Sequence, residues 1–226
     1  PRVLFDLATA EGAAKALTNP NGEVRYLAWT ALQEMGAKAV PALEKLWKGE
    51  NPRHRARALW ALGKMEGRGH GAVDAALADK NPDIRIVGIR LARQLGLKMP
   101  GKVAKVVRDD SAAVRREVSI ALRFDGSEPA NELWAELALQ HTGEDRWYLE
   151  ALGIGSDLHA NGRFAAWLAK AGKNWKSDGG RDIVWRVRST QAPEYLARII
   201  KDKSLKDHAS PRYMRAFDFH KGEEKN

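Results

Sequence analysis

Residues 24–32 read VRYLAWTAL, and this stretch recurs in altered form three times along the chain. The related stretches are HRARALWAL at 54–62, IRIVGIRLA at 84–92 and VRREVSIAL at 114–122. Each has arginine in second place (Arg25, Arg55, Arg85 and Arg115), which gives a repeat period of 30 residues. Self-similarity at a period of this length indicates an array of stacked structural repeats.

Both halves of each period have the spacing of an amphipathic helix. The stretch before residue 54 places Val40, Leu43, Leu46 and Trp47 on one helical face, and the quoted stretches form a second helix. An Asn-Pro or Ser-Pro pair is expected to cap helices, with proline in the first helical position, at Asn19, Asn51, Asn81 and Ser210. No segment alternates with the period of a strand, so the fold class is predicted to be all-α.

The repeats become less regular after the fourth. Arg146, Arg181 and Arg212 continue the series at spacings of 31, 35 and 31 residues. We therefore expect a single repeat domain over 1–226, with regular repeats to about 126, less regular repeats over 127–220 and a polar tail at 221–226. A longer connection is predicted around 172–180, and residues 153–155 (GIG) are interpreted as a turn between repeats.

The second helix of each period is expected to bury the same positions in every repeat. Small residues at the first of them would allow close helix approach, and Gly88 is explained if a neighbouring helix crosses there. The predicted core residues are Ala28, Ala31, Leu32, Ala58, Ala61, Leu62, Gly88, Leu91, Ala92, Val118, Ala121 and Leu122.

Composition excludes several kinds of chemistry within this segment. Cysteine is absent from the 226 residues, so disulfides, thiolate metal sites, cysteine nucleophiles and covalent haem attachment are excluded. The six histidines form no His-x-x-x-His pair, and no nucleophile–base set can be assembled locally. We therefore expect no enzyme activity, no cofactor and no metal. No apolar run approaches the ~20 residues of a membrane helix, and the first residues resemble no signal peptide, so the chain is interpreted as an excised or processed segment.

Two sets of basic residues are candidates for binding. We interpret Arg25, Arg55, Arg85 and Arg115 as a structural ladder that ties repeats together through acidic or carbonyl groups, with Glu23, Asp83, Asp109 and Asp110 as expected partners. A second set is expected on the outer face of the second helices, which would be the concave side. That candidate face comprises Tyr26, Arg57, Trp60, Lys64, Arg90, Arg93, Arg116 and Arg123. It could bind an acidic partner, or it could be a solvated face.

The chain contains eight tryptophans, of which most lie on or beside apolar stripes. Trp60 and Trp175 are predicted to be the most exposed of them. An exposed tryptophan on the candidate face would be a suitable anchor for a protein partner.

The 30-residue unit, with Val24-Arg25, Ile84-Arg85 and Val114-Arg115 opening the second helix, resembles HEAT repeats of the short bacterial, PBS-lyase-like type. That resemblance implies a right-handed α-solenoid of about seven helical hairpins. Residues 145–155 (DRWYLEALGIG) and 212–220 (RYMRAFDFH) are similar to the helical region of planctomycete- and verrucomicrobial-type haem-binding, dehydrogenase-like multidomain proteins. This second resemblance implies an exported parent, hence a periplasmic or secreted location, in which the array joins redox domains.

The favoured hypothesis is a non-catalytic, monomeric scaffold that binds a protein or neighbouring domains of the same chain without entering a membrane. The net charge of +9 favours an acidic partner surface. One alternative is a basic nucleic-acid-binding solenoid like the HEAT-like DNA glycosylases, which steeply salt-dependent DNA binding would support. Another is a bilin-lyase-like enzyme, which a failure to bind tetrapyrrole would exclude.

Overall fold

The structure, a computed structural model, describes residues 5–204 and 210–221, and within these residues it contains helices and no strand. The chain divides into two compact units, Pro1–Lys98 and Met99–Asn226. This division falls before the change in repeat regularity expected near residue 126. Residues 222–226 of the predicted polar tail lie outside the described residues.

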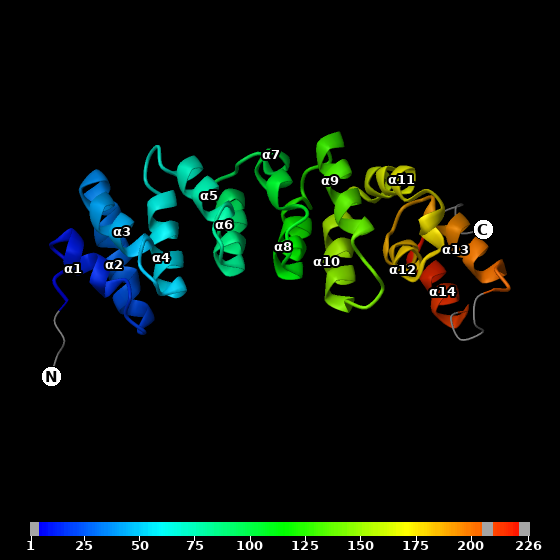
Figure 1. Cartoon of the computed structure of the whole chain (residues 1–226), viewed down its shortest axis with the longest axis horizontal. Helices are drawn as coiled ribbons and strands as arrows, with labels where there is room; N and C mark the ends of the chain where they lie inside the picture. The colour runs from blue at the N-terminus through cyan, green and yellow to red at the C-terminus, as the bar shows by residue number, and fades with distance from the viewer. Residues whose placement is uncertain (1–4, 205–209, 222–226) are drawn as a thin grey trace. The chain divides into compact units, whose positions relative to one another are not determined.

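The first unit consists of three helical hairpins (Figure 1). In each hairpin we call the first helix A and the second B. The pairs are α1 (Ala10–Ala16) with α2 (Gly22–Met35), α3 (Val40–Trp47) with α4 (Pro52–Gly63), and α5 (Gly69–Leu77) with α6 (Pro82–Gln94). A 3-10 turn, η1 (Gly36–Ala39), joins the first hairpin to the second.

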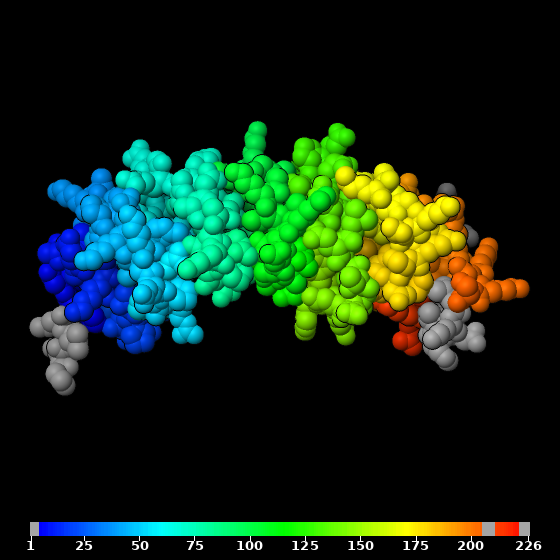
Figure 2. All heavy atoms as spheres, viewed as in Figure 1, coloured from blue at the N-terminus to red at the C-terminus, as the bar shows by residue number. Residues whose placement is uncertain are grey.

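The second unit continues the same alternation with four more pairs. They are α7 (Met99–Val103) with α8 (Ala112–Ala121), α9 (Glu128–Leu139) with α10 (Arg146–Ser156), α11 (Ala160–Ala171) with α12 (Asp178–Arg186), and α13 (Ala192–Lys201) with α14 (Ser210–Ala216). Short 3-10 segments are η2 (Ala104–Val106), η3 (Gly172–Lys176) and η5 (Phe217–Phe219). Within each unit, successive hairpins lie in direct contact in the space-filling view (Figure 2). The predicted all-α, solenoid-type fold class is confirmed.

The first four B helices begin at the same distance from the repeated arginine. Their N-caps are Asn21, Asn51, Asn81 and Ser111, each four residues before it. Asn51 and Asn81 cap helices α4 and α6, and a proline follows each of them in the first helical position, as predicted. Their side-chain oxygens accept hydrogen bonds from backbone N–H groups of the first turn. The prediction for Asn19 was wrong. Its Oδ1 instead accepts from Asn21 N at 2.8 Å, because the cap must keep its register with Arg25. Ser210 is the first residue of α14.

Small residues dominate the core of the first unit. Ala13, Ala16, Ala28 and Ala58 have no exposed surface, and they allow the helix backbones to approach closely. The predicted core positions of the B helices are all buried except Ala31, which is half-buried. A Cβ atom added at Gly88 would lie 2.7 Å from the Cβ of Ala76. Helix α5 therefore crosses α6 at Gly88, as predicted from the glycine in mid-helix.

Large aromatic side chains take over in the core of the second unit. Trp134, Phe164 and Trp167 are almost completely buried, and the rings of Phe164 and Trp167 stack with centroids 5.5 Å apart. The indole N–H of a buried tryptophan needs a partner, and Trp134 Nε1 donates to the carbonyl oxygen of Leu152 at 3.0 Å. Bulkier packing is consistent with the wider repeat spacing after residue 115.

Glycines that suggested turns in the second unit serve instead for close packing. Gly153 and Gly155 lie inside helix α10, so the interpretation of 153–155 as a turn was wrong. The predicted long connection at 172–180 is also absent from the described chain, because η3 leads directly into α12. A Cβ atom on Gly179 would lie 2.1 Å from the carbonyl oxygen of His141, which explains a glycine there without a loop.

Replacing Gly155 with valine should destabilise the second unit. A Cβ at this position would lie 2.4 Å from Ser119 Oγ and 2.5 Å from Ser119 O, so α8 and α10 would have to separate. Overpacking of this kind costs about 1–3 kcal/mol, measured as the change in the free energy of unfolding in urea. Gly71→Val is the control, because a Cβ atom at Gly71 meets no atom within 4 Å. An unchanged stability for Gly155→Val would contradict the observed helix packing.

Candidate protein-interaction surface

The ladder arginines hold the turn that precedes their own helix. Arg85 Nη1 donates to the carbonyl oxygen of Asp79 at 2.8 Å, and Arg115 Nη1 donates to those of Asp109 and Asp110 at 2.6 and 3.2 Å. Arg25 Nη1 binds the carbonyl oxygens of Asn19 and Pro20 in the same way. Carbonyl oxygens at a turn are thus satisfied by a cation that the following helix supplies. Of the four acidic partners expected for the ladder, Asp109 and Asp110 bind through their backbones.

Arg55 also links its hairpin to the next one. Its guanidinium forms an ion pair with the carboxylate of Asp79, in the turn before α6. Its Nε donates to the carbonyl oxygen of Trp47 at 3.0 Å, and the guanidinium carbon lies 4.6 Å from the centre of the Trp47 ring. Burial alone would raise the pKa of the Asp79 carboxyl. Hydrogen bonds from Arg55 and Asn81, with the nearby positive charges, lower that pKa below its ordinary value instead.

Arg57, a member of the candidate face, is engaged within the fold. Its Nη1 donates to the carbonyl oxygens of Leu17 and Asn19 at 3.1 and 3.4 Å, so it reaches back to the preceding hairpin. Burial, followed by the positive charges of Arg25 and Arg53, lowers its pKa. Arg57 therefore stabilises the stacking of hairpins in the first unit.

The other residues of the candidate face are divided between the two units. In the first unit Tyr26, Arg90 and Arg93 are exposed, whereas Trp60 and Lys64 are half-buried. In the second unit the two members of the candidate face, Arg116 and Arg123, are half-buried. Arg116 forms an ion pair with Asp145 at 3.1 Å, and the guanidinium of Arg123 lies 5.4 Å from the centre of the Phe124 ring. Several of the expected binding side chains thus also have structural roles.

The most exposed tryptophan is Trp147, and the prediction of Trp60 and Trp175 was wrong. Trp147 is 73% exposed, whereas Trp60 and Trp175 are half-buried. The ring of Trp175 packs edge-on against Tyr195, with centroids 5.0 Å apart. Trp147 follows Arg146 as the 64%-exposed Tyr26 follows Arg25, but Asp182 and Tyr213, which follow Arg181 and Arg212, are buried. The exposure of Trp147 therefore depends on its tertiary surroundings and not on repeat register.

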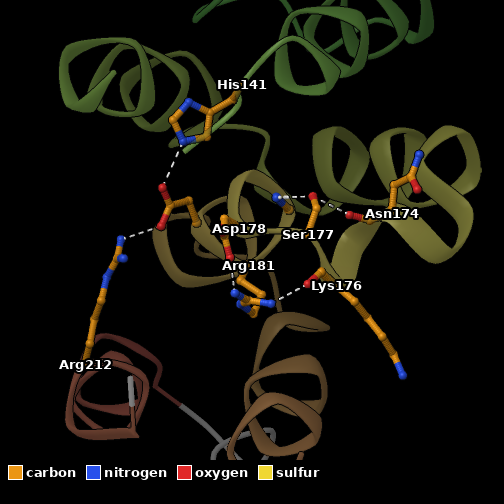
Figure 3. A network of polar contacts seen from close by, with 9 residues as sticks. His141, Asn174, Lys176, Ser177, Asp178, Arg181 and Arg212 are labelled. Carbon is orange, nitrogen blue, oxygen red and sulfur yellow. Dashed lines mark hydrogen bonds and ion pairs between the residues drawn. The ribbon is translucent and has the colours of Figure 1, made fainter. Parts of the chain in front are cut away.

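A polar network joins three hairpins of the second unit (Figure 3). His141 Nε2 lies 3.0 Å from Asp182 Oδ2, and Arg212 Nη2 lies 2.8 Å from Asp182 Oδ1. The guanidinium of Arg212 also lies 4.2 Å from the centre of the Trp185 ring. In the same view Arg181 binds both the Asp178 carboxylate and the carbonyl oxygen of Lys176. This repeats the turn-holding arrangement of the ladder arginines.

The geometry of this network fits a structural role. The side chain of His141 is 1% exposed, so no substrate can reach its ring in this conformation. The charges of Asp182 and Arg212 are paired across the hairpins, which stabilises the position of α14. Within the residues that the structure describes, no group of three or more His, Asp or Glu side chains is placed to hold a metal ion.

Arg163 is a fully buried cation that the sequence did not reveal. Its Nη2 donates to the carbonyl oxygens of Leu122 and Asp125 at 2.8 and 2.7 Å, at the end of helix α8. Burial lowers the pKa of its guanidinium to about 10, and the charge of Asp125 opposes that shift. The neighbouring helix in this way supplies the C-terminal cap of α8.

Stacked helical hairpins define a class, the α-helical repeat proteins. Within that class, residues 10–85 match the family model for HEAT repeats. The matched segment extends from the start of α1 into α6. A search of curated proteins gave no match. In the described part of the chain, no helix combines the length and the apolar character needed to span a membrane.

Proposed function

We propose that this chain is a non-catalytic scaffold whose B helices bind a protein partner or neighbouring domains of a longer chain. HEAT repeats commonly mediate protein interactions, and the match to that family model supports this class of function. Within each unit the hairpins present successive B-helix surfaces, and the first four B helices begin with the same spacing of N-cap and arginine. Binding would then depend on side chains that the fold leaves exposed.

The exposure of Trp147 is the observation that carries this proposal. A side chain 73% exposed leaves a large aromatic ring accessible to a partner. Tryptophan is also among the residue types that most often dominate binding energy at interfaces. The ion pair between Arg116 and Asp145 lies at the start of the same helix, and it would provide polar groups beside the ring. Tyr26 and Leu27 offer a comparable surface in the first unit.

The partner proposed for this scaffold is an acidic protein surface. A net charge of +9 favours association with negative charge through long-range attraction. Nucleic acid is less favoured, because Arg57 and Arg116 of the candidate face bind groups within the fold and are not wholly available to phosphates. DNA binding that weakens steeply with salt would support nucleic acid instead.

The finer setting is proposed from resemblance alone. The similarity of residues 145–155 and 212–220 to the haem-binding, dehydrogenase-like multidomain proteins supports an exported, extracytoplasmic parent. In such a parent this helical segment would join redox domains and would not itself carry the haem, because it contains no cysteine.

The proposal is tested by a pull-down with the whole chain as bait at moderate salt. Wild type, Trp147→Ala and Leu139→Ala are compared against fractions of the source cells. Leu139 is the matched control because it is an exposed apolar residue, 43% exposed, at the end of an A helix. We expect a discrete protein to be retained by wild type and by Leu139→Ala, and at least tenfold less of it by Trp147→Ala. Equal retention by all three would contradict the proposed surface.

A further inference from the structure

A pocket in the second unit lies where helices α9 and α11 begin and where the chain leads into α13. Its volume is about 360 Å³. Arg188, Asn131, His159, Asn161, Thr190 and Leu158 are among the residues that line it. None of them belongs to the candidate face that the repeat pattern suggested, so the pocket is a separate feature of the molecule.

Arg188 gives this pocket its positive charge. The two carboxylates near it, Glu150 and Asp157, both pair with Arg186, at 3.1 and 3.5 Å. Among the described residues no carboxylate forms an ion pair with Arg188, whose Nη1 donates to the carbonyl oxygens of Trp185 and Val187. Burial lowers the pKa of this half-buried guanidinium, so its charge is incompletely compensated. An anionic group in the pocket would compensate it.

The polar lining is held close to the main chain by two glycines. A Cβ atom on Gly162 would lie 2.5 Å from Asn131 Nδ2, and one on Gly126 would lie 2.6 Å from the ring of His159. Asn131 Oδ1 has no hydrogen-bond partner within the described part of the chain. A ligand that carries an N–H donor as well as an anionic group would satisfy this acceptor after a small rotation of the side chain.

One apolar side chain lines the pocket, and another lies against Arg188. Leu158, in its lining, is 53% exposed. Phe219 is 60% exposed, and the Arg188 guanidinium lies 4.6 Å from the centre of its ring. An apolar border favours a ligand with an apolar group next to its anionic group. A peptide segment combines all three features, namely a carboxylate, amide N–H groups and an apolar side chain.

We infer that this pocket binds a peptide segment of a partner protein through an Asp or Glu side chain seated on Arg188, with an adjacent apolar residue against Leu158 and Phe219. The inference rests on the proposed scaffold function and makes its partner chemistry specific. The proposed partner would then have two contacts with the chain, one at Trp147 and one in this pocket. The carboxylate would bind the guanidinium by charge-assisted hydrogen bonds.

The test uses a phage-displayed library of random 12-residue peptides, selected on the whole wild-type chain. Selected peptides are then synthesised with a fluorescein label and titrated by fluorescence anisotropy. We expect peptides that pair Asp or Glu with an apolar neighbour, and at least tenfold weaker binding to Arg188→Gln. Arg198→Gln, which removes a charge from an exposed i,i+4 pair on α13, should bind like wild type. Leu158→Ser supplies a second pocket variant, also expected to weaken binding, and circular dichroism checks the fold of each variant.

Several outcomes would overturn the inference. One is the absence of any peptide that depends on Arg188, and another is an equal loss with Arg188→Gln and Arg198→Gln. Selective capture of mixed-sequence DNA by the pocket would also exclude the peptide assignment. Peptides lost with Trp147→Ala but kept by Arg188→Gln would leave the scaffold function in place while removing the pocket from it.

Discussion

Replacing Arg163 with alanine is expected to lower the free energy of unfolding by about 3 kcal/mol. The substitution removes a fully buried side chain and leaves the carbonyl oxygen of Asp125 without the guanidinium that it binds. The carbonyl oxygen of Leu122 still accepts a hydrogen bond from Asp125 N, so losing the guanidinium costs less at Leu122 than at Asp125. Burying the arginine charge is itself unfavourable, which offsets part of what its hydrogen bonds contribute.

Two further variants make the Arg163 prediction specific. Arg163→Met keeps most of the volume and removes the buried charge, so we expect about half of the alanine effect. Arg108→Ala is the control, because Arg108 forms an ion pair with Glu136 while its own side chain is 76% exposed, and such pairs contribute about 0–1 kcal/mol. Urea unfolding followed by circular dichroism measures all three. A loss for Arg163→Ala no larger than for Arg108→Ala would show that Arg163 does not cap α8.

Replacing Asp79 with alanine is expected to cost about 2–4 kcal/mol of unfolding free energy. The Asp79 carboxylate binds Arg55, whose side chain is only 16% exposed, and its Oδ1 accepts from Asn81 N at 2.9 Å. Alanine removes both interactions and leaves the guanidinium of Arg55 half-buried without its anion. Asp79→Asn keeps the acceptor for Asn81, so we expect it to recover part of the loss.

The stability that Asp79 contributes is also expected to depend on pH. The folded state lowers the pKa of this carboxyl below its ordinary value of 3.8, so its ionised form is stabilised by folding. That contribution is present above the ordinary pKa and is lost as the pH falls through the folded-state pKa. The difference in stability between wild type and Asp79→Asn should therefore be constant near neutral pH and shrink in acid. A difference that grows as the pH falls would contradict the ion pair with Arg55.

The repeat pattern predicted the helices and the core because both depend on short-range periodicity. Arg25, Arg55, Arg85 and Arg115 set the register of the first four B helices, and the predicted core positions of these helices are buried except for the half-buried Ala31. The same local pattern shows why Asn19 misled the prediction. An Asn-Pro pair is a common cap, but the register with Arg25 selects Asn21.

Features that depend on distant partners could not be predicted in this way. Arg163 binds carbonyl oxygens 41 and 38 residues earlier in the chain, and nothing near it in sequence indicates burial. Gly155 suggested a turn because its function, the close approach of Ser119, is a tertiary contact. The binding face was predicted from charge, yet Arg57 and Arg116 have partners within the fold. The exposure of Trp147 was likewise not predictable from the repeat, because Asp182 and Tyr213 follow ladder-type arginines in the same way and are buried.

The central claim, that the chain binds a protein partner through the exposed side of its B helices, is tested most directly by site-specific photo-crosslinking. Benzoylphenylalanine is introduced at position 147 in one variant and at position 139 in another, and each is irradiated with fractions of the source cells. The account predicts a discrete protein adduct from position 147 and little or none from position 139. Equal adducts at both positions, or adducts to nucleic acid alone, would contradict it.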